Sequence, residues 1–296
     1  MQYSKPALTY EEQADLLLWR GLQADRGLLI SRLKRVNYYR LSGFLYPFRD
    51  HNDRFKPGTN LDVVWRRYTF DRRLRLTVLD AIERVEIAIR TQLIYEHVHR
   101  YGPFGYVNRA TLPNLTGDRF NQFLSRVTEE TKRSHEVFVD HFKKKYGDTH
   151  NDLPLWIVSE ILPFGAMYTL FMGADPDIKR TIADTYRIPD KVLISWLNVL
   201  NTVRNICAHH GRLWNRELGV KPLMPNIRKH PQWHQPVAIP NHRVFAVLTI
   251  LKYMTSFIAP QSGWPIRLHN LLAEYADIPK ASMGFPQDWR NCPIWQ

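Results

Sequence analysis

The sequence predicts an all-α protein, and three observations support that fold class. Apolar residues recur at steps of three and four along most of the chain, which is the period of an amphipathic helix. Residues typical of helix caps stand at the ends of several of these stretches. No stretch alternates apolar and polar residues over the length of a strand. We therefore expect helices joined by loops that glycine and proline mark.

The first half of the chain begins with a helix whose two ends are both marked. Thr9 is followed three residues later by Glu12, which is the pattern of a capping box. That helix is expected to run to about Arg20 and to end at Gly21, since glycine adopts the left-handed conformation of a C-terminal cap. Periodicity predicts further helices over 25–36, 60–99 and 116–146.

The second half is expected to hold shorter helices and one of intermediate length. Pro189 is suited to the first turn of a helix whose apolar stripe is Val192, Leu193, Trp196, Leu200 and Val203. Gly211 is expected to be the left-handed residue that ends it. Residues 222–240 hold five prolines and predict an irregular crossing, and 285–296 predict an extended strap. The remaining helices are expected over 154–161, 164–172, 176–186, 243–258 and 265–275.

Composition points to a folded protein with a polyanionic partner. Lys and Arg total 41 against 28 Asp and Glu, which gives a formal charge of +13, and 44% of residues are hydrophobic. Nucleic acid is the commonest partner for such a surplus, and an anionic membrane surface is the alternative. Two cysteines, Cys207 and Cys292, exclude a disulfide framework and a zinc site built on cysteine pairs.

We expect a cytoplasmic protein that does not cross a membrane. No apolar run approaches the ~20 residues that a membrane helix needs. The segment Met1–Pro6 is not followed by the apolar core of a signal peptide. The chain is expected to divide into an N-terminal helical and aromatic segment, a helical core and a C-terminal helical extension, together forming one globular unit: 1–55, 56–216 and 217–296.

Three basic segments are candidates for RNA binding, because arginine and lysine hold phosphates and aromatic side chains stack on bases. Each has an alternative explanation. The arginines of the long helix can pair with Asp62, Asp71 and Asp80, and the aromatic residues of 37–48 can anchor the N-terminal helices. The lysine run follows the preference for positive charge at a helix C-terminus. The candidates are Arg40, Arg66, Arg67, Arg72, Arg73, Arg75, Lys143, Lys144 and Lys145.

The segment Arg204–Arg216 carries the candidate active site. RNA cleavage without a metal needs a proton carrier, which histidine supplies near neutral pH, and a cation that clamps the phosphate, which arginine supplies. Arg204, Asn205 and His209 provide the clamp, an orienting amide and the proton carrier, and the expected supporting residues are His210 and Arg212. No metal or cofactor is expected, because adjacent histidines diverge and no ligand motif completes a shell.

Spacing alone leaves other interpretations of this segment open. Arg204 and His209 are five residues apart and diverge by about 140° on a regular helix. They can converge if the helix loosens near Gly211, or if a second subunit completes the site. A purely structural interpretation has the histidines capping the helix, with Trp214 buried. Arg90 and His97 also fit an arginine–histidine spacing, but they lie within the long helix among apolar residues and are interpreted as structural.

The pattern Arg204-Asn205-x-x-x-His209 resembles the Arg-x(4–6)-His motif of the HEPN superfamily of ribonucleases, in which a polar residue often follows the arginine. The surrounding sequence resembles the Abi (AbiD/AbiF-like) abortive-infection proteins of bacteria. The hexapeptide alone is weak, whereas several blocks in the same order are specific. The matching blocks are Lys5–Gln13, Asn37–Gly43, Phe70–Arg75, Asp80–Glu86 and Arg204–Arg216.

This resemblance implies more than the residues alone do. It implies a compact HEPN-like helical bundle with an N-terminal helical extension and C-terminal helices, dimeric, with two motifs facing each other. It implies RNA cleavage that leaves 2′,3′-cyclic phosphate and 5′-hydroxyl ends, in phage defence or toxin–antitoxin regulation, under the control of a small non-coding RNA. The competing hypotheses are a non-catalytic RNA-binding protein of the same fold and a helical protein-interaction module.

Overall fold

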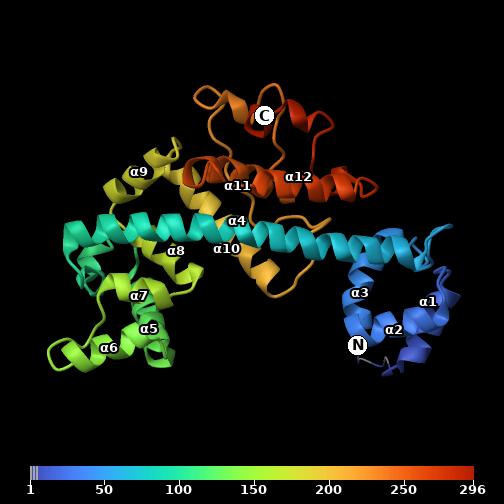
Figure 1. The fold of residues 1–296 in the computed structure, drawn as a ribbon, viewed down its shortest axis with the longest axis horizontal. Coiled ribbons are helices and arrows are strands. Elements are labelled where there is room, and N and C mark those ends of the chain that lie inside the picture. The colour runs from blue at the N-terminus through green and yellow to red at the C-terminus, as the bar shows by residue number, and fades with distance from the viewer. Residues whose placement is uncertain (1, 3, 5) are drawn as a thin grey trace. The chain divides into compact units, whose positions relative to one another are not determined.

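The computed structural model describes residues 2, 4 and 6–296, and over these residues the protein is all-α, as the sequence predicts. Twelve α-helices and seven short 3₁₀ helices are present in this part of the chain, with two isolated β-bridges in place of any strand (Figure 1). None of its helices has both the length and the apolar content needed to cross a bilayer. Lys5, which opens the first motif block, and two residues of the Met1–Pro6 segment lie outside the described residues.

The chain forms two units, and each combines segments that are distant in sequence. The first consists of Met1–Leu76 with His269–Ile278, and the second of Thr77–Leu268 with Pro279–Gln296. Two of the three divisions fall inside helices, α4 (Leu61–Tyr101) and α12 (Trp264–Glu274), and the third follows Ile278. The boundaries expected after residues 55 and 216 stay a prediction.

The first unit contains α1 (Tyr10–Trp19), α2 (Arg26–Val36), α3 (Tyr38–Leu45) and the start of α4, and α1 packs on α2. The capping box is confirmed, because Thr9 accepts from the Glu12 amide while Glu12 accepts from the Thr9 amide. Gly21 ends this helix with φ +98°, as predicted. Its amide bonds to the Leu18 carbonyl, and the next amide bonds to the Leu17 carbonyl, which closes the cap.

The aromatic segment 37–48 forms α3 and a 3₁₀ turn, Tyr46–Phe48. Phe44 is buried and packs edge-on against Tyr68, with 5.3 Å between ring centroids, so part of the segment anchors the helices of this unit. Tyr39 and Tyr46 behave differently, because they are 86% and 73% exposed. The anchoring of the N-terminal helices therefore explains Phe44 but not Tyr39 and Tyr46, whose side chains face solvent.

The second unit holds the helices that carry the candidate site. α5, α7 and α8 pack together, and α8, α9 and α11 pack against α10. The region 116–146 was expected to be one helix and is two, because the chain turns extended at Ser134, whose hydroxyl accepts from the Glu136 amide at 3.3 Å. The bounds are α5 Gly117–Arg133, α6 Val137–Tyr146, α7 Leu155–Ile161, α8 Phe164–Gly173, α9 Pro176–Thr185, α10 Asp190–Ala208 and α11 Val244–Ile258.

The buried stripe predicted for α10 is confirmed at every position. It also includes Leu197, Val199 and Cys207, so the helix is enclosed over about half of its circumference. Trp196 lies at its centre and donates its indole N–H to the Leu223 carbonyl at 2.8 Å. The C-terminal segment 285–296, expected as an extended strap, instead forms two 3₁₀ turns, Trp289–Asn291 and Pro293–Trp295, whose indoles pack at 5.3 Å.

His97 is a fully buried histidine on α4 in the second unit. Its ring lies 5.1 Å from that of Tyr101, and neither ring nitrogen has a hydrogen-bond partner among the described residues. Burial lowers the pKa of His97 to about 4, because the charged imidazolium loses its hydration. This histidine is therefore neutral in the folded protein, which favours the structural interpretation of the Arg90–His97 pattern.

We predict that His97 makes the protein acid-sensitive. The unfolded chain takes up a proton at His97 near pH 6.5, whereas the folded chain does so only near pH 4. Stability is therefore complete above pH 6.5 and is lost as the pH falls toward 4, by up to about 3 kcal/mol. Urea unfolding at pH 7 and pH 4.5 should show a smaller pH difference for His97→Leu than for the wild type. The exposed His135, changed to Gln, should keep the wild-type difference.

Candidate functional site

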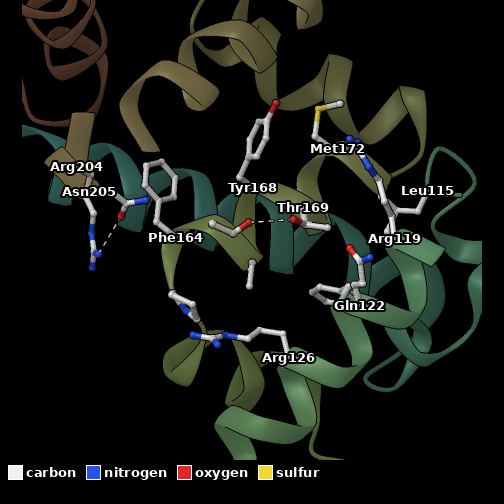
Figure 2. Close-up of a pocket in the computed structure, with 14 residues that line it drawn as sticks. Leu115, Arg119, Gln122, Arg126, Phe164, Tyr168, Thr169, Met172, Arg204 and Asn205 are labelled. Atoms are coloured by element: carbon white, nitrogen blue, oxygen red, sulfur yellow. Dashed lines mark hydrogen bonds between the residues drawn. The ribbon is translucent and has the colours of Figure 1, made fainter. Parts of the chain in front are cut away.

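A groove of about 650 Å³ in the second unit brings together α5, α8 and α10. Figure 2 shows Arg204 and Asn205 of α10 at one end and Arg119 and Gln122 of α5 toward the other, with Arg126 of α5 between them in this view. Tyr168, Thr169 and Met172 of α8 form the facing wall. The full lining is Leu115, Arg119, Gln122, Phe123, Arg126, Pro163, Phe164, Gly165, Ala166, Tyr168, Thr169, Met172, Arg204 and Asn205.

Arg204 and Asn205, two of the three predicted catalytic residues, lie together in this groove. The Arg204 guanidinium donates to the Asn205 side-chain oxygen at 3.4 Å (Figure 2). Arg204 is half-buried and Asn205 is exposed, because both flank the buried stripe of α10. An oxyanion in the groove can therefore reach a guanidinium that the neighbouring amide orients.

Glu86 of α4 provides the negative charge behind Arg204. Burial raises the pKa of this carboxyl, and the positive charges of Arg90 and Arg204 offset part of that rise. Arg90 forms an ion pair with Glu86 at 2.6 Å and donates to the Leu162 carbonyl at 3.1 Å, next to the groove residue Pro163. The field of Glu86 thus acts on the motif arginine, and Arg90 holds Glu86 against the segment that leads into α8.

His209 and His210 form the C-terminal cap of α10. The His210 amide bonds to the Cys207 carbonyl at 3.0 Å and the Gly211 amide to the Ile206 carbonyl at 2.7 Å, which is a Schellman motif. The residue in the left-handed conformation is His210, with φ +59°, so the expectation that Gly211 would occupy this position is wrong by one residue. Glycine at 211 avoids a different problem, since a Cβ there would lie 3.1 Å from the Ile206 carbonyl oxygen, which is a tight contact.

His209 does not line the groove that holds Arg204 and Asn205. The helix stays regular up to this residue, since the His209 amide bonds to the Asn205 carbonyl at 2.9 Å, and its side chain is exposed. The divergence of about 140° expected between Arg204 and His209 on a regular helix therefore persists. Of the two routes to convergence, loosening of the helix does not occur before His209, and completion by a second copy is still available.

The structural interpretation of this segment is correct for Trp214, which is 1% exposed. It is correct in a different form for the histidines, because their backbone amides, and not their rings, close the cap. Arg212, expected as a supporting residue, is half-buried, and its carbonyl accepts from the Arg216 guanidinium at 2.8 Å. Backbone hydrogen bonds thus close the cap.

Sequence reasoning missed the two α5 arginines of the groove. Arg119, Gln122 and Arg126 are spaced by three and four residues, so they share one face of the helix, next to the buried face of Phe120, Phe123 and Val127. That spacing is a usable signal, although the apolar positions of the same helix form the more prominent pattern. Burial raises the pKa of the facing Tyr168, and the positive charge of Arg119 offsets part of the rise, so the Tyr168 hydroxyl stays protonated at neutral pH.

The arginines predicted to bind RNA along α4 are mostly engaged inside the first unit. Arg75 is 6% exposed and pairs with Asp71. Arg66 pairs with Asp277 at 2.8 Å, and Arg73 pairs with Glu274. Arg67 lies 4.0 Å over the Phe48 ring. A phosphate would have to displace these partners, and Arg75 offers it no surface.

The other predicted RNA-binding residues lie at the surface. Arg40 and Arg72 are exposed, as are all three lysines near the end of α6. Lys143 donates to the Thr131 carbonyl at 3.1 Å, and the Lys145 ammonium lies 5.1 Å from the Tyr146 ring centre. These residues stay candidates for RNA contact, and none of them lines the groove.

A family model described as Abi-like protein matches residues 31–215, which is more than half of the chain. The chain belongs to the Abi-like family. The Abi-like match ends at Asn215 and so includes the α10 cap and every residue that lines the groove. Comparisons with curated proteins and with solved structures return no match. Within the described residues, no group of three or more His, Cys, Asp or Glu is placed to hold a metal ion.

We predict that Gly211→Ala destabilises the α10 cap. The new methyl group would meet the Ile206 carbonyl oxygen and Cγ2 atom, both at 3.1 Å, so a well-packed turn must shift. We expect a loss of about 1–3 kcal/mol in the free energy of unfolding, measured by urea titration. Gly219→Ala is the matched control, because its Cβ would have nothing within 4 Å. Equal stability of the two variants would show that the cap tolerates the crowding.

Proposed function

We propose that this Abi-like protein is an endoribonuclease of the HEPN type that cleaves RNA without a metal and acts in abortive infection or toxin–antitoxin defence against phage. The observation that carries the proposal is the pairing of Arg204 with Asn205 in an arginine-lined groove, five residues before an exposed histidine on the same helix. Membership of the Abi-like family and the +13 charge support it. We place this activity in the cytoplasm.

The chemistry divides among three side chains. Arg204 holds the scissile phosphate and stabilises the charge that develops on it during attack by the 2′-hydroxyl. His209 transfers the proton, either from that hydroxyl or to the departing 5′-oxygen. Asn205 orients the guanidinium through the bond described above. The products are a 2′,3′-cyclic phosphate and a 5′-hydroxyl.

The protein acts as a homodimer in this proposal. The helix is regular between Arg204 and His209, so one copy does not aim both side chains at the same phosphate. In a two-fold symmetric dimer the same surface of each copy forms the interface. Arg204 of one copy can therefore act on the same phosphate as His209 of its partner. A small non-coding RNA that binds the basic surface and regulates cleavage completes the proposal.

One alternative has a specific observation in its favour. His209 lies outside the groove, so Arg204 and the α5 arginines can bind RNA without cleaving it. The protein would then be an RNA-binding scaffold for a small RNA. The two functions differ in the effect of removing the histidine, because a proton carrier acts on the transition state while affinity is spread over many phosphate contacts.

We predict that the protein, freed of bound RNA, cleaves RNA in the presence of EDTA. His209→Ala should lower the cleavage rate by about 10²–10⁴-fold with RNA affinity and melting temperature nearly unchanged. Arg204→Ala should also abolish cleavage and should weaken binding. Gel analysis of end-labelled RNA, with 2′-deoxy substitution at the cut site, measures the rate and tests the role of the 2′-hydroxyl.

The neighbouring histidine supplies the control. His210→Asn removes the imidazole and keeps a residue that tolerates the left-handed conformation, so the backbone bonds of the cap can still form. This variant should cleave at a rate much closer to wild type than His209→Ala does. Cleavage that EDTA abolishes and a divalent metal restores would refute the mechanism, and so would full activity of a folded Arg204→Ala/His209→Ala variant.

We also predict that two inactive variants complement each other. If each site takes Arg204 from one copy and His209 from the other, a heterodimer of Arg204→Ala with His209→Ala keeps one intact site. Half of the dimers in an equal mixture are heterodimers, so activity should recover to about a quarter of wild type. Co-refolding or co-expression followed by the cleavage assay measures this. No recovery, in a sample shown to contain heterodimers, would place both side chains in one copy.

A further inference from the structure

The groove beside Arg204 has an unusual charge pattern for its size. Three guanidiniums line it, those of Arg119, Arg126 and Arg204, and no carboxylate does. The part of α4 in the first unit differs, since Arg66, Arg73 and Arg75 there all pair with carboxylates. A concave surface lined by one sign of charge favours an extended anion over a neutral or cationic ligand.

The two long walls of the groove differ in chemistry. The α5 wall presents Arg119, Gln122 and Arg126, all exposed and about two helical turns long, or roughly 10 Å. The α8 wall presents Tyr168, half-buried, with Thr169 and Met172 beside it. Figure 2 shows the Tyr168 ring and the Arg119 side chain on these separate elements. One wall thus suits phosphates, and the other offers an aromatic face and apolar atoms to a base.

We propose that this groove binds the single-stranded segment of RNA next to the scissile phosphate, with Arg119 and Arg126 on its backbone and Tyr168 stacked on one of its bases. The assignment rests on the proposed function for the position of the cut at Arg204. A base must be unpaired to reach Tyr168, so the groove selects single strands over duplexes. Gln122, between the two arginines, is placed to hydrogen-bond a base edge or a ribose.

The two α5 arginines contribute unequally. Arg126 is already paired, with Glu130 at 2.7 Å and Glu129 at 3.3 Å. Arg119 has no carboxylate within ion-pair distance among the described residues, and its charge acts on Tyr168. Arg119 therefore supplies the stronger phosphate contact, and Glu130 competes with the RNA for Arg126.

Binding of a 2′-O-methylated single-stranded oligonucleotide of about ten residues tests this assignment, because such a strand is not cleaved through its 2′-oxygen. Fluorescence anisotropy on protein stripped of bound RNA should show Arg119→Gln weakening affinity about 10-fold. Arg126→Gln should weaken it less, about 3-fold, and Glu130→Gln should strengthen it. Lys132→Gln, exposed on the same helix but outside the groove, should leave affinity unchanged.

Two further measurements probe the nature of the contacts. The slope of log affinity against log salt should fall by about 0.7 in Arg119→Gln, as expected for one lost phosphate contact to a single strand. Tyr168→Phe should bind like wild type because it keeps the aromatic face, whereas Tyr168→Leu should bind about 10-fold more weakly. Melting temperatures and far-ultraviolet circular dichroism confirm that each variant is folded.

Three results would overturn the assignment: Arg119→Gln binding as Lys132→Gln does, a duplex of the same sequence competing as well as the single strand, or uridine monophosphate binding as tightly as the oligonucleotide. The last would make the groove a mononucleotide pocket. The outcome is separate from that of the cleavage assay. If the variants bind as predicted but the protein does not cleave RNA, the groove is an RNA-binding site and the proposed nuclease activity is wrong. If the protein cleaves RNA and Arg119→Gln has no effect on binding, the nuclease activity stands and the RNA strand does not bind in this groove.

Discussion

The candidate site depends on how α10 is rotated about its own axis, and Trp196 fixes that rotation. This indole is fully buried, donates to the Leu223 carbonyl at 2.8 Å, and packs against Trp233 and Tyr253 at 4.9 and 5.9 Å. A helix anchored in this way is not free to turn about its axis, because every other position of its stripe is also close-packed. Arg204 and Asn205 consequently emerge beside the groove, and His209 emerges on another side of the helix.

The protein uses arginine in two ways that its net charge does not distinguish. Along the start of α4, arginines form ion pairs within the first unit, and Arg75 with Asp71 is buried. Around the groove no carboxylate is among the lining residues, and Arg119 has no ion-pair partner among the described residues, although Arg126 is paired with Glu130. A surplus of +13 therefore predicts a polyanionic partner without telling where it binds. The location depends on which guanidiniums have already been neutralised, and that is a property of the fold.

Local patterns in the sequence predicted the features that depend on local physics. The capping box at Thr9, the cap at Gly21 and the stripe of α10 each follow from residues within a few positions of one another, and all three are confirmed. The break after Arg133 was missed because no glycine or proline marks it; a serine side chain stabilises it instead. Of the three predicted catalytic residues, the structure places Arg204 and Asn205 together and His209 outside their groove.

Features that depend on distant contacts were not predictable in this way. The partner of Arg66 is Asp277, 211 residues along the chain, so no helical spacing points to it. The groove joins α5 to α10, and only the packing of α8 between them brings Arg119 and Arg204 to one space. Periodicity tells which face of a helix is buried but not what lies opposite the other face. The motif can therefore be found in the sequence, whereas its neighbours in space come from the tertiary fold.

The left-handed backbone at His210 has a consequence for how the adjacent histidines are understood. Only a few residue types adopt the left-handed conformation without serious strain: glycine, asparagine, aspartate and, less readily, histidine. The backbone conformation at position 210 thus restricts the choice of residue whether or not the second histidine takes part in catalysis. A tandem pair of histidines suggests two cooperating bases, but the left-handed conformation is by itself a reason for one of these few residues at 210. Substitutions that evolution or an engineer samples at 210 will be limited by torsion angles before they are limited by catalysis.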